Sequence, residues 1–367
     1  MTQNQFVGSY VEDMKLAMIA SLVSQQHAMF IGKPGTGKTA ILRSGAENSV
    51  GDRKVFIRFA PSTQPQKVEG MFDPAAAVAK PPRFVLVRKG SAYDEDALVL
   101  LLDELSRGSD IVFDMILDVL DRQDIDVSLQ SVAWATGNFP PSTARSEALR
   151  DRFALWFWVR QGMPDVSAVI MAHATNMHSL LSVGDMPTWT EVEEVRKAVP
   201  GRKAIKVCDE ILTLLSQEAS KAGLEVNNRR ITQWFNLLYR TNVWKYGTAD
   251  FNVSHPEASK VLSWAWAATD EQKATEWQKI AGCVVDIVGV AINELKQKTL
   301  EQVKEMLKRT AGQPRSQLAI ALGEIVAEGK REIESLNIHD PRIQQALQEL
   351  EDVFVMITQG KNPFETE

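Results

Sequence analysis

Cysteine is scarce in this sequence of 367 residues, which contains only two. Cys208 and Cys283 are far apart, and neither lies near a second cysteine or a pair of histidines. We therefore expect no disulfide framework and no zinc site. Two buried free thiols in a reducing compartment, the cytoplasm, explain both residues.

Long hydrophobic runs and an excess of basic charge are also missing. No apolar run reaches the roughly 18 residues that a membrane span needs. The first residues, Thr2–Gln5, are polar and do not form the basic region followed by an apolar region that marks a signal peptide. The formal net charge is -6, with a pI near 5.6. We therefore expect no signal peptide, no membrane span and no nucleic acid as the main partner.

Strand-like and helix-like segments alternate in the first half of the chain. Helical spacing covers residues 11–26, 38–48 and 111–121, and strand-like runs occupy His27–Ile31, Val55–Phe59, Phe84–Val87, Leu98–Leu102 and Ser131–Thr136. After about residue 160 only helical patterns follow, including Cys208–Ala222, Arg230–Tyr239 and the charged tail from about 276 to 359. This order predicts an α/β domain with a parallel sheet (1–185), a helical lid (186–275) and a helical C-terminal extension (276–367).

A glycine-rich loop with a phosphate-binding pattern follows the first strand-like run. It fits G-x4-G-K-[ST] at every defined position and reads Gly32, Lys33, Pro34, Gly35, Thr36, Gly37, Lys38 and Thr39, with Ala40 next. Glycines allow successive backbone N–H groups to curl around a phosphate, and the helix that follows adds its positive end. We expect ATP here, with Lys38 on the β- and γ-phosphates and the Thr39 hydroxyl on Mg²⁺.

Two carboxylates follow the apolar run Val99–Leu102. A strand buried on both faces would place Asp103 and Glu104 at its carboxyl end, where open α/β sheets bind ligands. We expect Asp103 to hold the Mg²⁺ shell and Glu104 to polarise the attacking water. A solvated acidic turn is the alternative, but the position about 65 residues after a phosphate loop favours the catalytic reading.

Three further polar residues are candidates for the hydrolytic site. Asn138 ends the run from Ser131, and on a strand beside Leu98–Leu102 it would orient the lytic water; a turn-forming role before Pro140 is its alternative. Arg150 and Arg152 both compete to reach the γ-phosphate of a neighbouring subunit, with a solvated helix end as the alternative for both.

The order of these motifs resembles the MoxR branch of the AAA+ ATPases, which includes the proteins called RavA, NorQ and CbbQ. The resemblance covers roughly residues 6–270. It rests on GKPGTGKT, VFIRFAPSTQPQKVEG, LLLDELSR, ALRDRF and LDVLDRQDIDVSLQSVAWATGNFPP, in which Leu120–Val127 looks like the hairpin before the sensing strand. The lid segment Val261–Trp266 looks most like that of RavA, and residues 276–367 match nothing familiar.

The resemblance implies roles for two arginines and a set of partners. It places the arginine finger, which acts on the ATP of a neighbouring subunit, at Arg152. It places the second sensor, an arginine of the lid in a stretch similar to Ser-x-Arg-Arg, at Arg229, with Arg230 left as the alternative. Asn227 stands where serine is usual, and asparagine caps a helix nearly as well. Family analogy further implies a hexameric ring and a partner with a von Willebrand factor A domain.

The sequence thus predicts a Mg²⁺-dependent ATPase that works as a ring and remodels or activates a partner protein. A non-hydrolysing nucleotide switch is disfavoured because Lys38, Asp103, Glu104 and Arg152 are all present. A nucleic-acid-linked motor of a phage or defence system is the remaining alternative. The acidic pI disfavours it, and stimulation of turnover by single-stranded DNA or RNA would distinguish it.

Overall fold

A five-stranded parallel sheet forms the centre of the first domain. The computed structural model describes residues 10–125, 131–138, 145–159, 183, 185–285, 287–309, 315–334 and 341–359. The strands are β1 (His27–Ile31), β2 (Lys54–Arg58), β5 (Val99–Asp103), β6 (Val132–Gly137) and β7 (Phe153–Trp158), in the order β2-β5-β6-β1-β7. Every pairing among them is parallel, which confirms the predicted sheet.

Helices cover both faces of this sheet, so its central strands are buried throughout. The helices of this domain are α1 (Tyr10–Ser24), α2 (Lys38–Val50), α5 (Asp110–Ile125) and α6 (Arg145–Arg152), with a 3-10 turn, η2, at Leu105–Arg107. Alternate residues of β1 join different cores: Phe30 packs with α1 and α2, whereas Ile31 packs with α5. Trp156 and Phe157 of β7 are buried as well, as expected for a core strand.

The second domain is a layer of helices that continues the core around α1. It contains α8 (Trp189–Lys197), α9 (Arg202–Lys221), α10 (Asn228–Tyr246), α11 (Pro256–Val261), the 3-10 turn η4 (Leu262–Trp264) and α12 (Glu271–Val285). Cys208 of α9 is buried and free, as predicted, and burial raises the pKa of its thiol to about 12. The side chain of Cys283 lies outside the described residues.

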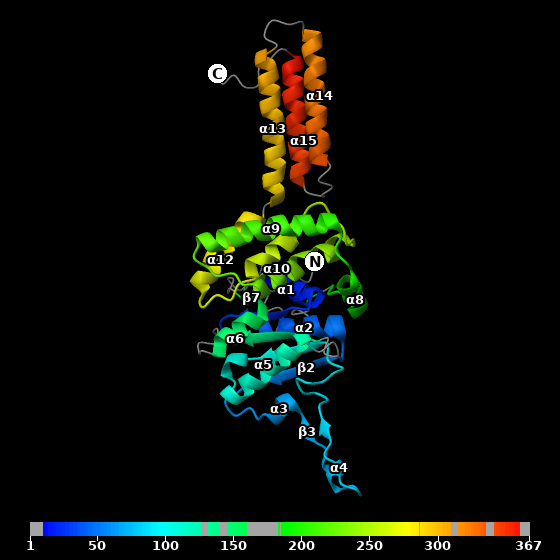
Figure 1. Ribbon diagram of the computed structural model, residues 1–367, viewed down its shortest axis with the longest axis vertical. Coiled ribbons are helices and arrows are strands. Elements are labelled where there is room, and N and C mark those ends of the chain that lie inside the picture. The colour runs from blue at the N-terminus through cyan, green and yellow to red at the C-terminus, as the bar shows by residue number, and fades with distance from the viewer. Residues whose placement is uncertain are drawn as a thin grey trace, which may run out of the picture.

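A three-helix bundle with its own small core follows, formed by α13 (Ile287–Arg309), α14 (Arg315–Glu334) and α15 (Pro341–Thr358). Figure 1 shows it projecting from the helical layer, away from the sheet. The boundary expected at residue 275 falls within α12, where Trp277 stacks on Trp234 and Trp266. We therefore propose that the second domain extends to the end of α12.

Two local expectations differ from the structure. The run Phe84–Val87 is not a strand of the parallel sheet: only Leu86–Val87 pairs, as β4, with β3 (Met71–Phe72) in a separate antiparallel ribbon. Together with the short helices α3 (Gln66–Glu69) and α4 (Pro74–Val78), this ribbon projects from the sheet domain (Figure 1). The hairpin expected at Leu120–Val127 is also wrong for its first part, because residues 120–125 continue α5, and 126–130 lie outside the described residues.

Among the described helices, none is long and apolar enough to cross a membrane.

Candidate functional site

The glycine-rich loop connects β1 to α2, as the pattern predicts. Gly35 and Gly37 have φ angles of 81° and 79°, a left-handed conformation that favours glycine. Gly32 lies against β7, where an added Cβ would come within 2.7 Å of the carbonyl oxygen of Val159. The conformation of this loop therefore depends on all three glycines, two for their backbone angles and one for close approach.

Lys38 folds back over this loop. Its Nζ donates to the carbonyl oxygens of Gly32 (2.7 Å) and Lys33 (2.8 Å) and to Oγ1 of Thr36 (3.1 Å). Burial lowers the pKa of Lys38, while the nearby carboxylates of Asp103 and Glu104 act in the opposite direction. The ammonium group is thus held at the loop by acceptors that phosphate oxygens can replace.

The predicted metal ligands are in direct contact, and a buried threonine joins them to the predicted base. Oγ1 of Thr39 donates to Oδ1 of Asp103 over 2.6 Å. Oγ1 of Thr136, on β6, donates to the same Oδ1 over 2.8 Å and accepts from the backbone N–H of Glu104 over 2.9 Å. Thr136 was not predicted from the sequence, although it lies on β6 only two residues before the predicted Asn138.

Two arginines pair with the acids in this structure, and neither was predicted from the sequence. Nε of Arg58, at the end of β2, lies 3.1 Å from Oδ2 of Asp103, and Nη1 of Arg107 lies 2.6 Å from Oε2 of Glu104. Glu104 also has a φ angle of 54°, which is uncommon for a residue with a side chain. The carboxylate of Glu104 is therefore held by its own η2 turn through Arg107.

Asn138 directly follows β6, which lies between β5 and β1. The residue before it, Gly137, accepts a backbone hydrogen bond from Gly32 over 3.1 Å. Because these strands are parallel, their carboxyl ends place Asn138 between Asp103 and the glycine-rich loop. The orientation of the lytic water by its side chain stays a prediction.

The bridge through Thr136 leads to a test of the site. Thr136→Val keeps the side-chain shape but leaves the N–H of Glu104 without its acceptor and removes a donor from Asp103. We expect ATP turnover to fall about 10- to 100-fold and the Mg²⁺ concentration for half-maximal turnover to rise. Thr136→Ser should restore both values because it retains the hydroxyl. Equal turnover and Mg²⁺ dependence in Thr136→Val and the unchanged protein would show that the bridge is not used.

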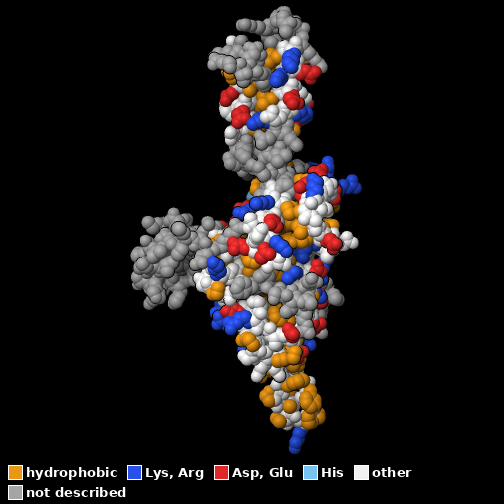
Figure 2. Space-filling view, turned by 90° about the vertical axis from the view of Figure 1, so that its left-hand side faces the viewer, with side chains coloured by type: hydrophobic (Ala, Val, Ile, Leu, Met, Phe, Trp, Pro, Cys, Tyr) orange, Lys and Arg blue, Asp and Glu red, His pale blue; other side chains and the backbone are white. Residues whose placement is uncertain are grey.

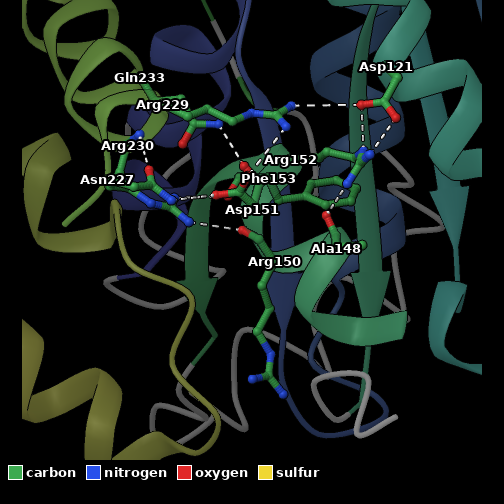
Figure 3. Close-up of polar contacts among 10 residues, drawn as sticks. All are labelled: Asp121, Ala148, Arg150, Asp151, Arg152, Phe153, Asn227, Arg229, Arg230 and Gln233. Carbon is green, nitrogen blue, oxygen red and sulfur yellow. Dashed lines mark hydrogen bonds and ion pairs between the residues drawn. The ribbon is translucent and has the colours of Figure 1, made fainter. Parts of the chain in front are cut away.

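Two of the candidate arginines, Arg152 and Arg229, lie around Asp121 of α5 and Asp151 of α6 (Figure 3). Arg152 donates to both carboxylate oxygens of Asp121, and its Nη1 donates to the carbonyl of Ala148 over 2.7 Å. Arg229, from the first turn of α10, lies 3.3 Å from Asp151 and 4.0 Å from Asp121. Arg152 and Arg229 thus share one carboxylate cluster.

Arg230 and Arg150 differ from these two. Arg230 is buried; its guanidinium donates to the carbonyls of Arg150 (3.0 Å) and Phe153 (3.4 Å) and lies over the ring of Trp266. Burial lowers its pKa to about 10. The side chain of Arg150 points away from the cluster in Figure 3. Packing of the lid against the sheet domain thus occupies Arg230, which leaves Arg229 as the more accessible arginine of the pair.

The arginine cluster and the glycine-rich loop lie at opposite ends of the parallel strands. In the β1–β7 pairing, His27 lies beside Phe153, next to Arg152, whereas Ile31 lies beside Trp158. Four residues of strand separate the two ends by about 13 Å at roughly 3.3 Å per residue. The arginines therefore lie far from the phosphate loop of their own chain.

Sequence comparisons show which known proteins the first domain resembles. Residues 27–153 match the model of the AAA domain (dynein-related subfamily). A stretch of 125 residues is 32% identical to the ATP-dependent protease ATP-binding subunit-like protein AmiB of Pseudomonas aeruginosa, covering 30% of this chain and 33% of that protein. The chain thus spans about a third of the length of this curated relative.

The fold has a counterpart among solved structures. A structure from Cytophaga hutchinsonii, assigned as a candidate ATPase, superimposes with a TM-score of 0.53 at 16% identity, covering 77% of this chain and 90% of that one. Together these matches confirm the AAA+ domain and the fold class expected from the sequence.

Proposed function

We propose that this chain, an AAA+ ATPase by its domain and fold, is of the MoxR type and hydrolyses ATP in a ring of identical subunits to remodel or activate a partner protein. The observation that carries the proposal is the contact chain Thr39–Asp103–Thr136–Glu104 beside Lys38. It brings the glycine-rich loop, two oxygens that could ligate a metal and a candidate base to one edge of the sheet.

Each residue at this edge has a role in the proposed hydrolysis. The loop N–H groups and Lys38 bind the phosphates, Thr39 and Asp103 would hold Mg²⁺, and Asn138 orients the attacking water. Glu104 accepts the proton of that water. In this structure Oε2 of Glu104 is ion-paired with Arg107. Bound Mg²⁺ would supply positive charge to the phosphate oxygens.

The position of the arginine cluster supports action between subunits. Arg152 and Arg229 lie at the amino ends of the strands, away from their own phosphate loop. Both contact Asp121, and Arg229 also pairs with Asp151. We propose that both serve the nucleotide of a neighbouring subunit, Arg152 as the finger and Arg229 as the second sensor. In a closed ring, one face of each subunit meets a different face of the next, so each ATP site would contain residues of two chains.

The donor set fits Mg²⁺, since a hydroxyl and a carboxylate lie in contact and Mg²⁺ prefers oxygen ligands completed by phosphate and water. The purified protein should therefore hydrolyse ATP with Mg²⁺ or Mn²⁺ and lose this activity when EDTA is added. Phosphate release at increasing Mg²⁺ concentration measures the effect, and readdition of Mg²⁺ should restore it. Undiminished turnover in EDTA would contradict the proposed function.

The finer parts of the proposal rest on the resemblance to the MoxR branch. A hexameric ring, a partner with a von Willebrand factor A domain and a place in the cytoplasm are proposals of this kind. The size of the assembly in the presence of ATP can be measured directly by sedimentation or native mass spectrometry.

A further inference from the structure

The ribbon that leaves the sheet domain carries its apolar side chains on the outside. The apolar projection, defined as residues 71–89, contains no buried residue. Phe72 is 65% exposed, Phe84 86% and Val78 82%. Figure 2 shows hydrophobic side chains gathered over this end of the molecule. A patch of this kind on an ordered element is typical of a surface that contacts another molecule.

The projection is ordered by its own hydrogen bonds rather than by a core. The N–H of Asp73 donates to the carbonyl of Val85 over 2.8 Å, and the N–H of Arg83 donates to the carbonyl of Ala76 over 2.9 Å. The Asp73 side chain caps α4, and the rings of Phe72 and Phe84 meet edge to face at 6.5 Å. The apolar side chains are thus presented on a defined backbone, which lowers the entropic cost of binding.

A groove of about 670 Å³ lies at the base of the projection. Its lining includes Phe56 and Arg58 of β2, Lys67, and Met71, Phe72 and Val87 of the ribbon. Among the strands that the structure describes, β2 pairs only with β5 and so lies at an edge of the sheet. The groove is therefore bordered by an apolar ribbon on one side and by an open strand edge on the other, which suits an extended polypeptide.

Charge indicates the kind of polypeptide. The projection has four basic residues (Lys80, Arg83, Arg88, Lys89) and one acidic residue (Asp73), a net charge of +3 in a chain whose net charge is -6. The groove adds Lys67 and Arg58. Positive potential on this part of an otherwise acidic protein attracts a segment that carries carboxylates. Lys80 and Arg83 flank the prolines farthest along the projection, so an end-on insertion into a bilayer would have to bury charge.

We propose that the apolar projection and its groove bind an extended segment of a partner protein that is both acidic and apolar. The inference deepens the proposed function, since it assigns the surface that meets the partner to be remodelled. Arg58 lines the groove and also lies 3.1 Å from Asp103. A segment that binds in the groove and contacts Arg58 can therefore alter the ion pair between Arg58 and the candidate metal ligand. Binding of such a segment should therefore change the rate of ATP turnover.

The test uses the full-length protein and β-casein, a disordered acidic protein, as the probe. The double variant Phe72→Ser/Phe84→Ser should bind β-casein at least about tenfold more weakly, because two exposed rings lose apolar contact. The core of the sheet domain should be unchanged, since neither ring is buried in it. Val199→Ser, a matched control that is 78% exposed and lies between α8 and α9, should bind like the unchanged protein. β-Casein with amidated carboxylates should bind weakly to every variant.

Three results would overturn the inference. The first is equal β-casein affinity in the double variant and the unchanged protein. The second is loss of the assembly in the double variant, which would make the projection a contact between subunits. The third is tighter binding to phosphatidylserine vesicles than to β-casein, abolished in the double variant. Binding of β-casein through the projection without any ATP turnover would contradict the proposed function and leave this inference standing.

Discussion

Glu104→Gln should bind ATP as tightly as the unchanged protein while its steady-state turnover falls at least about 100-fold, since a positioned general base contributes roughly 10²–10⁴ in rate. The amide keeps the shape of the side chain but cannot take a proton from water. Lys38→Ala should instead lose ATP affinity, because the Lys38 ammonium is the cation held directly at the glycine-rich loop.

Two matched variants control this comparison. Lys203→Ala removes an exposed lysine of α9, outside the loop, and Glu95→Gln neutralises an exposed carboxylate close in sequence to Glu104. Both should keep affinity and turnover. Labelled-nucleotide binding and phosphate release measure the two quantities separately. Turnover at the level of the unchanged protein in Glu104→Gln would remove Glu104 from its proposed role and with it the proposed mechanism.

Local pattern was enough to predict the residues at the carboxyl ends of β1 and β5. The loop needs glycines for its backbone conformation, and a strand buried on both faces needs an unbroken apolar run such as Val99–Leu102. Both features can be recognised in a short stretch of sequence. The same holds for the α/β order that placed these strands in one sheet. Asp103 and Thr39 meet because parallel strands align their carboxyl ends.

Contacts between distant segments explain what the sequence did not reveal. Arg58 pairs with Asp103 only because β2 lies beside β5, and Thr136 joins two acids only because β6 lies on the other side. The apolar run Phe84–Val87 was expected in the sheet because periodicity does not distinguish a buried strand from an exposed ribbon. Its exposure depends on its position outside the parallel sheet, which a short stretch of sequence does not reveal.

The position of the arginine cluster leads to the second large effect, which depends on assembly. Arg152→Ala leaves the phosphate loop and Glu104 intact, whereas Glu104→Gln leaves Arg152 intact. Each variant alone should be nearly inactive, since loss of a trans-acting arginine costs about 10³–10⁵ in rate. When equal amounts exchange at random in a ring, about a quarter of the interfaces pair an intact site with an intact finger. Activity should therefore reappear on mixing.

The same experiment decides which arginines act between subunits. If Arg229 serves the neighbouring site, as its place beside Asp121 and Asp151 suggests, Arg229→Ala mixed with Glu104→Gln should also recover turnover. An Arg229 that serves its own site gives no recovery, because neither subunit then offers a complete site. Turnover is measured against mixing ratio, with subunit exchange followed by native mass spectrometry. Recovery with Arg150→Ala, together with full activity of Arg152→Ala alone, would move the finger to Arg150. Arg152 would then serve only to hold Asp121, the contact it makes within its own chain.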